Sequence, residues 1–230
     1  QGVSSAASDV YKRQLVSLGG QRIASSRDFD PDTGQLRAPN QVVLVEADQV
    51  ARLVEVLQGQ PATVLSVKHR ERESLPKERY RTVTLQAAAA SQLSWSTART
   101  SRVAQRLYEN GHITYIRTDS VMLSAEAIGT ARAIAAAFGP AYVPATPPVF
   151  KGAEGPAQEA HEAIRPAGDQ WLAAADKDLP EAEGKLYDLI YRRTVASQMA
   201  PARIETTTVE VGCGEAVYRI RCQRTLFDGH

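Results

Sequence analysis

The sequence predicts an α+β fold in which β-rich segments flank a helical block. Three observations predict it. The pair Gly19 and Gly20 separates two short apolar runs, as in a β-hairpin. Apolar residues recur at helical spacing through the middle of the chain, and a strand-like pattern returns after Pro201. With 230 residues, 43% of them hydrophobic, the chain is long enough to bury a sizeable core.

The first β-rich segment opens with this hairpin, because two-residue hairpin turns need positive φ. Its two strands are expected at residues 15–18 and 21–24. Further along, the apolar pattern predicts a strand, a helix that Gly59 ends, and a second strand. These three elements are expected at residues 41–46, 47–58 and 62–68.

A helical block follows Pro76, where the composition changes to a charged stretch. Ser96 and Ser124 are suitable N-caps, since a serine hydroxyl accepts a hydrogen bond from the first turn of a helix. A proline-rich connector at residues 140–156 separates the last two helices. The expected helices are residues 84–93, 97–110, 125–138 and 183–199.

The chain returns to strands at residues 203–211 and 216–222, and it contains no internal repeat. Residues 1–14 lack the apolar core of a targeting signal. They resemble translated adaptor sequence, so we interpret them as a non-native leader. The expected division of the chain is therefore a leader at 1–14, a β-rich part at 15–75, a helical domain at 76–201 and return strands at 202–230.

Overall charge does not indicate a nucleic-acid partner, because 27 basic and 26 acidic residues nearly cancel. Local charge does indicate one, since clusters of basic residues can form a surface that follows phosphates. The alternative is a set of solvated faces. The clusters are Lys68, His69, Arg70 and Arg72, then Lys77, Arg79 and Arg81, then Arg99, Arg102 and Arg106.

Cys213 and Cys222 are the two cysteines of the chain, too few for a zinc site. Nothing in the sequence indicates secretion, so free thiols in a reducing compartment are expected. The sequence also has no apolar run of about 18 residues, which argues against a membrane span.

Tyr115 and Arg117 form the most informative pair, in the run Gly-His-Ile-Thr-Tyr-Ile-Arg-Thr-Asp-Ser. On a strand, residues two apart point to the same face, so phenol and guanidinium would lie side by side. A phenol with a pKa of roughly 10 is a poor nucleophile at neutral pH. An adjacent arginine favours the phenolate and grips two phosphate oxygens, which suits attack on a phosphodiester.

This run resembles the nucleophile segment of the type IA DNA topoisomerases. Five further stretches match the family in the same order, and the resemblance covers nearly all of residues 15–230. The Gly-Gly hairpin and an Asp-Phe-Asp-Pro loop are closer to the topoisomerase I branch. The matching stretches are residues 15–31, 84–86, 102–111, 158–166 and 186–199.

The resemblance implies a β-rich gate segment split around an inserted helical domain, of the helix-turn-helix or CAP-like kind, that carries the nucleophile. It implies that Tyr115 attacks single-stranded DNA to give a 5′-phosphotyrosine linkage. Strand passage and religation then relax negative supercoils without ATP. DNA would be the substrate, and the protein would act in the cytoplasm at the nucleoid.

The resemblance also assigns roles to individual residues. Arg117 and His161 would act with Tyr115, His161 by binding phosphate or relaying a proton. His161 and Arg165 are expected to share one face of a helical turn. Thr84 would donate to phosphate, although capping a helix explains it equally well. The expected DNA contacts are Arg165, Thr84, Arg99, Arg102, Thr118 and Ser120, with Asp119, Glu162 and Gln158 in supporting positions.

Type IA enzymes also need a Toprim domain, whose carboxylates hold Mg²⁺ beside the tyrosine. The run Asp-Phe-Asp-Pro-Asp at residues 28–32 reads as a turn-rich loop, so we expect the Mg²⁺ ligands outside this chain. The chain would then be an internal fragment, inefficient in cleavage without Toprim and the remaining domains. The alternatives are a non-catalytic module that binds single-stranded DNA, and a purely structural part of a clamp hinge.

Overall fold

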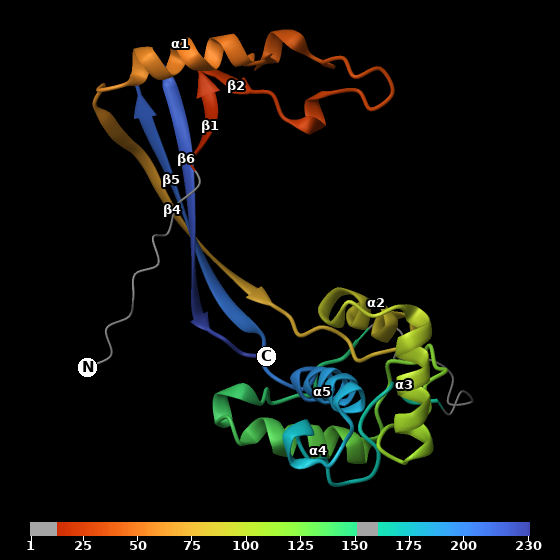
Figure 1. Ribbon diagram of the computed structural model, residues 1–230. Coiled ribbons are helices and arrows are strands. Elements are labelled where there is room, and N and C mark those ends of the chain that lie inside the picture. Colours follow the sequence, from red (N-terminus) through yellow and green to blue (C-terminus); the bar gives the residue numbers. More distant parts are fainter. Residues whose placement is uncertain (1–12, 151–160) are drawn as a thin grey trace. The chain divides into compact units, whose positions relative to one another are not determined.

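The computed structural model describes residues 13–150 and 161–230, and it confirms a mixed α+β fold. The chain divides into two compact units (Figure 1). The sheet unit comprises the described part of residues 1–72 together with residues 204–226. The helical unit comprises the described part of residues 73–203 together with residues 227–230.

The sheet unit is built on six strands in the order β3-β2-β1-β6-β5-β4. The predicted hairpin is confirmed, since Gly19 and Gly20 turn the chain between β1 and β2 with φ angles of 57° and 78°. Three long strands, β4, β5 and β6, run side by side (Figure 1). The strands are β1 (Arg13–Leu18), β2 (Gln21–Ile23), β3 (Val42–Val43), β4 (Ala62–Ser74), β5 (Ala202–Cys213) and β6 (Ala216–Phe227).

Three strand predictions differ clearly in length from the structure, and one of them is β6, which continues to Phe227 beyond the predicted end at residue 222. Strand β3 is shorter than expected, because Pro39–Gln41 form a 3₁₀ turn before it and Glu46 caps helix α1 (Ala47–Leu57) after it. Strand β4 is longer, because it continues through a charged stretch that has no apolar alternation. Backbone pairing with β5 sustains it there. Strand β1 begins at Arg13, and Arg13 and Gln14 pair with Ile220 and Arg219 of β6.

The helical unit contains α2 (Thr82–Leu93), α3 (Thr97–Glu109), α4 (Ala125–Ala136) and α5 (Glu181–Ala196). Both predicted N-caps are confirmed. The Ser96 hydroxyl accepts from the backbone N–H of Arg99, and the Ser124 hydroxyl accepts from that of Ala127. Among the described residues, no helix is long and apolar enough to cross a membrane.

Helix α5 is the centre of this unit, because it packs against α2, α3 and α4. Leu186 and Ile190 of α5 are fully buried in one cluster with Leu107 of α3. The same cluster includes Ile113 and Ile116, which lie in the segment between α3 and α4. The core of the helical unit therefore lies directly beneath the residues that flank Tyr115.

Candidate active site

Tyr115 and Arg117 lie in the segment of residues 112–124, which joins α3 to α4. The prediction of a strand is wrong here, since the segment makes one isolated bridge, between Ile113 and Pro166. No strand runs alongside it in the described structure, so its backbone groups are held one at a time. Even so, Tyr115 and Arg117 are exposed while Ile116 between them is buried. This alternation places the phenol and the guanidinium on the exposed side of the segment.

Thr114 fixes the residue just before the tyrosine. Its hydroxyl donates to the carbonyl of Ala163 at 2.8 Å and accepts from the N–H of Arg165 at 3.0 Å. Its own N–H donates to the carbonyl of Arg165 at 2.9 Å. Both side chain and backbone of Thr114 thus attach Tyr115 to residues 163–165.

Residues 161–166 are extended, so the prediction that His161 and Arg165 share a helical turn is wrong. Ile164 bridges to Tyr80 and Pro166 bridges to Ile113, which draws this stretch into contact with residue 113 instead of coiling it. The extended path brings the exposed ring of His161 to a centroid distance of 6.3 Å from the ring of Tyr115. Tyr108 contacts the tyrosine as well, edge to face at 5.2 Å.

A hollow of about 330 Å³ lies beside this segment. It gathers five of the residues that the sequence indicated, together with Thr82, which the sequence reasoning missed. The guanidinium, the hydroxyl groups and the imidazole around this cavity are suited to an anion, and among the described residues the Asp119 carboxylate is the one lining group that repels it. The lining residues are Thr82, Arg117, Thr118, Asp119, Ser120 and His161.

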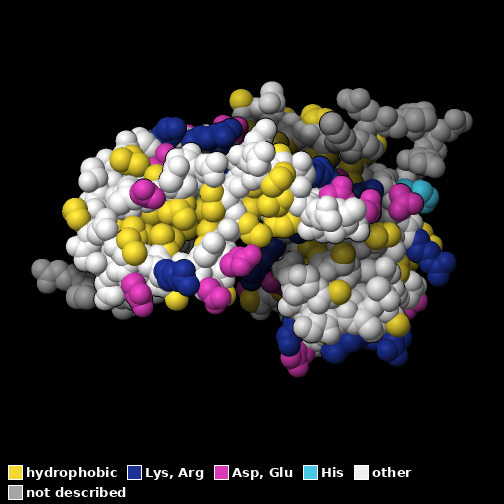
Figure 2. All heavy atoms as spheres, turned by 90° about the horizontal axis from the view of Figure 1, so that it is seen from above, with side chains coloured by type: hydrophobic (Ala, Val, Ile, Leu, Met, Phe, Trp, Pro, Cys, Tyr) yellow, Lys and Arg dark blue, Asp and Glu magenta, His cyan; other side chains and the backbone are white. Residues whose placement is uncertain are grey.

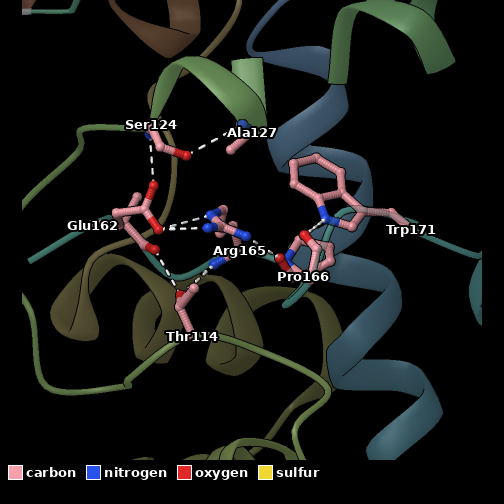
Figure 3. Close-up of polar contacts among 9 residues, drawn as sticks. Thr114, Ser124, Ala127, Glu162, Arg165, Pro166 and Trp171 are labelled. Carbon is pink, nitrogen blue, oxygen red and sulfur yellow. Dashed lines mark hydrogen bonds and ion pairs between the residues drawn. The ribbon is translucent and has the colours of Figure 1, made fainter. Parts of the chain in front are cut away.

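Arg165 is directed into the protein. Its guanidinium donates hydrogen bonds to the carboxylate of Glu162 at 2.6 Å and to the carbonyl of Pro166 at 2.8 Å (Figure 3). It also lies over the ring of Trp171, and its side chain is 12% exposed. Arg165 therefore stabilises residues 161–166 through these contacts, whereas the sequence led us to expect a contact with DNA.

Glu162 links Arg165 to helix α4. One carboxylate oxygen accepts from the backbone N–H of Ser124, the N-cap of α4, at 2.6 Å, and the other accepts from Arg165 (Figure 3). Burial opposes ionisation of Glu162, but the hydrogen bonds from Arg165 and Ser124 outweigh it and lower the pKa of the carboxyl. The supporting position expected for Glu162 therefore has a structural basis.

The hydroxyls of Thr118 and Ser120 shape the turn after Arg117. Thr118 accepts from the N–H of Ser120, and Ser120 accepts from the N–H of Met122. Each hydroxyl acts as an acceptor in these bonds and keeps its own proton for donation. Asp119 is exposed, and within the described residues it makes no hydrogen bond or ion pair with Arg117.

The Thr84 hydroxyl is engaged within helix α2. It accepts from the N–H of Arg81 at 2.8 Å and donates to the carbonyl of Arg81 at 3.2 Å. This geometry favours the capping explanation over phosphate contact.

A family model described as DNA topoisomerase matches residues 31–230 of this chain, which carry the whole of the site. The chain belongs to this DNA topoisomerase family. The resemblance to type IA enzymes that the sequence indicated is thereby confirmed.

Individual relatives agree. The chain is 40% identical to DNA topoisomerase 1 of Synechocystis over 96% of its length, and 39% identical to that of Mycobacterium tuberculosis over 97%. It spans about a quarter of the length of these curated relatives, 25% in both cases. Full-length topoisomerase I from Thermotoga maritima has a similar structure, with a TM-score of 0.65, 31% identity, and coverage of 83% of this chain and 32% of that one.

In this topoisomerase chain, the arginines of helix α3 form the predicted exposed stripe. Arg99 lies over the ring of Trp95 at 4.4 Å, and Arg106 pairs with Glu183 at 2.7 Å. Arg102 is exposed on the same helix. All three arginines of this stripe are exposed, but two of the three guanidinium groups already have a partner within the protein.

The other basic clusters are not uniformly surface features. Arg79 is 4% exposed, donates to the carbonyl of Val121 at 2.7 Å and lies over the ring of Phe150. Burial lowers the pKa of Arg79 to about 10. Arg81 pairs with Glu78. The expectation that Arg79 belongs to a phosphate-following surface is therefore wrong, because charge patterning alone cannot distinguish a buried arginine from an exposed one.

The donor set does not fit a Mg²⁺ site within the described residues. No group of three or more histidine, cysteine, aspartate or glutamate side chains there could hold a metal ion. Of the carboxylates near Tyr115, Glu162 already binds Arg165 and Ser124. Gln158, the remaining supporting residue expected from the sequence, lies outside the described residues.

Thr82 and Thr114 are two of the residues near the tyrosine that sequence reasoning missed, and Tyr108, whose ring contacts that of Tyr115, is another. The Thr82 hydroxyl contacts the backbone of the segment, whereas the Thr114 hydroxyl, within the segment, contacts the backbone of Ala163 and Arg165. Their position in the sequence could have indicated them, since Thr114 directly precedes the tyrosine and Thr82 lies two residues before Thr84. Residue type by itself does not reveal that a threonine holds a distant carbonyl.

Proposed function

We propose that this chain is the nucleophile-bearing part of a type IA DNA topoisomerase, and that Tyr115 cleaves one DNA strand by transesterification. The observation that carries the proposal is the exposed Tyr115 ring, with His161 at 6.3 Å and Arg117 on the same side of the segment. Beside them lies a hollow whose lining includes Arg117, His161 and the hydroxyls of Thr118 and Ser120 as donors for a backbone phosphate, together with the carboxylate of Asp119.

The step conserves bonds and charge. The phenol oxygen of Tyr115 forms a bond to phosphorus, and the bond from phosphorus to the 3′ oxygen breaks. The proton lost by the phenol is matched by the proton that the 3′ oxygen gains. One phosphodiester replaces another, so religation is the reverse reaction and needs no ATP.

The surrounding side chains bind the phosphate and transfer the proton. Arg117 holds two phosphate oxygens. His161 binds a phosphate oxygen or passes on the phenol proton. Thr118 and Ser120 donate to the same phosphate or its neighbour, and Arg99 and Arg102 contact the backbone further along. Mg²⁺ is implied by the family, and the residues that the structure describes hold no group of side chains that would supply its ligands.

The wider proposal concerns the rest of the protein. The sheet unit is proposed as part of a gate, split around the inserted helical domain that carries Tyr115. A single-stranded segment of negatively supercoiled DNA is the proposed substrate, at the nucleoid. The Toprim domain and the other domains of the full-length protein are the proposed partners, in line with relatives four times as long as this chain.

The test combines this chain with a separately produced type IA Toprim fragment, Mg²⁺ and single-stranded DNA labelled at its 3′ end. Labelled protein that survives denaturation is the expected product, because the linkage is to the 5′ phosphate of the downstream strand. Tyr115→Phe should abolish it. Tyr108→Phe is the matched control, since Tyr108 contacts the same ring edge to face and should leave the adduct in place.

Two results would contradict the proposal. An adduct that persists in Tyr115→Phe would assign the nucleophile to another residue. If the two fragments associate and bind DNA but no adduct forms, a non-catalytic single-stranded DNA-binding module becomes the better description. In that case the exposed rings of Tyr108 and Tyr115 would serve as a stacking platform for bases.

A further inference from the structure

The segment that carries Tyr115 and Arg117 lacks the support of a helix or a strand ladder. Its shape depends on separate contacts from neighbouring parts of the helical unit. On the N-terminal side of the tyrosine, these contacts join Thr114 to Ala163 and Arg165. On the other side, the contacts come from Thr82, the first residue of helix α2.

Thr82 makes hydrogen bonds to the backbone on both sides of Arg117. Its hydroxyl donates to the carbonyl of Ile116 at 2.6 Å and accepts from the N–H of Thr118 at 3.0 Å. Its own N–H donates to the carbonyl of Thr118 at 3.1 Å. The residues on both sides of Arg117 are therefore held by one threonine.

The chemistry of a helix start explains why this residue can do so. The first N–H groups of a helix have no partner within the helix, so that of Thr82 is available to a neighbouring carbonyl. A hydroxyl can donate and accept at once, which a carboxylate or an ammonium group cannot do. Helix α2 is itself fixed by Leu85 and Ala89, which are buried in the core.

The position of Arg117 follows from this arrangement. Ile116 and Thr118 are buried on either side of it, at 7% and 6% exposure, while Arg117 is exposed at the hollow. Within the described residues, no hydrogen bond or ion pair fixes its guanidinium. The starting point of that side chain is therefore set by the backbone, and the backbone there is held by Thr82.

We propose that Thr82 is a positioning residue, which clamps the backbone on both sides of Arg117 so that the guanidinium meets the phosphate attacked by Tyr115. This inference rests on the proposed function. A displacement of about 1 Å in a reacting group can cost a hundredfold in rate. Loss of the clamp should accordingly slow cleavage more than it weakens DNA binding.

The test uses Thr82→Val, which keeps the branched shape and removes the hydroxyl, and Thr82→Ser, which keeps the hydroxyl. In the adduct assay with Toprim fragment, Mg²⁺ and saturating single-stranded DNA, Thr82→Val should slow adduct formation by about tenfold to a hundredfold. Its dissociation constant for the DNA should change by less than about threefold. Thr82→Ser should restore most of the rate, which a general loss of packing would not allow.

Thr130→Val is the matched control. Thr130 lies on helix α4, and its hydroxyl also holds a backbone carbonyl, that of Asp169, at 3.2 Å. It makes no hydrogen bond with residues 112–124. The control should therefore form the adduct at the wild-type rate, although it too loses a hydroxyl that connects a helix to a loop.

Amide hydrogen exchange on the chain alone separates the two proposals. Thr82→Val should speed exchange of the Thr118 amide by about tenfold, because its acceptor is gone. Unchanged exchange, or a wild-type rate of adduct formation in Thr82→Val, would overturn the clamp. A wild-type chain that forms no adduct would overturn the proposed function instead, and the exchange result would still judge the clamp.

Discussion

The two units of the chain are held together in different ways. In the helical unit, side chains such as Leu107 and Ile190 are completely buried. In the sheet unit, Val54 of α1 and Val64 of β4 are 59% and 58% exposed. Figure 2 shows hydrophobic side chains exposed on the face that it draws. The clusters of buried hydrophobic side chains among the described residues belong to the helical unit, so we expect it to depend on side-chain burial more than the sheet unit does.

The difference explains why the candidate site belongs to the helical unit. A segment without regular structure, such as residues 112–124, keeps a defined shape only against a rigid support. Ile113 and Ile116 anchor it in the core, and Thr82 and Thr114 hold its backbone. Such contacts require a close-packed neighbour.

The strongest test of the comparison is a pair of truncations in hydrophobic side chains. Leu107→Ala should lower the free energy of unfolding by about 2–5 kcal/mol, because it leaves a cavity in the core. Val54→Ala, at an exposed position of α1, should change it by less than about 0.5 kcal/mol. Urea unfolding measures both, with tryptophan fluorescence to follow Trp95 and Trp171 of the helical unit and amide exchange to follow the sheet. A large loss in Val54→Ala would show that the sheet unit depends on side-chain burial after all.

Ion pairs provide a second, smaller test. The Glu183 side chain is 8% exposed and pairs with Arg106, so Arg106→Ala leaves a buried carboxylate without its partner. We expect a loss of about 1–3 kcal/mol. Arg224→Ala removes a pair with Glu205 whose arginine is 72% exposed, and should cost less than about 0.5 kcal/mol. Equal effects of the two variants on urea unfolding would contradict the distinction between the units.

The smallest expected effect depends on pH. The pKa of Glu162 is lowered in the folded protein, so its contribution is present above the ordinary glutamate pKa and is lost as pH falls through the folded value. Glu162→Gln should therefore lower the free energy of unfolding by about 1 kcal/mol at pH 7, and by less at pH 3. Urea titrations at the two pH values measure this. A gap between variant and wild type that widens on acidification would contradict the prediction.

Local signals in the sequence predicted most of the regular elements. Ser96 and Ser124 marked two helix starts, and Gly19 and Gly20 marked the hairpin, because caps and tight turns are decided by a few adjacent residues. The path of residues 112–118 was not predictable in this way. Its partners, Thr82 and residues 163–165, are distant in sequence, and no local pattern reveals them.

The candidate site was predicted in part, for a related reason. The sequence indicated Tyr115, Arg117 and His161, and the structure brings these three together. It also indicated Arg165, whose guanidinium is instead directed into the protein. A motif identifies which side chains are chemically suitable, whereas burial and competing partners decide which of them remain available to a ligand.

The strand order of the sheet has a consequence for the order in which the chain acquires its structure during synthesis. Strands β1, β2 and β3 come from the first part of the chain, and β4 follows after α1, but these two groups do not pair with each other. The hairpin of β5 and β6 lies between them and is synthesised after both groups. During synthesis on a ribosome, helices α2 to α5 can therefore pack together before β1 can pair with β6 and before β4 can pair with β5. The sheet is completed only when β6 emerges.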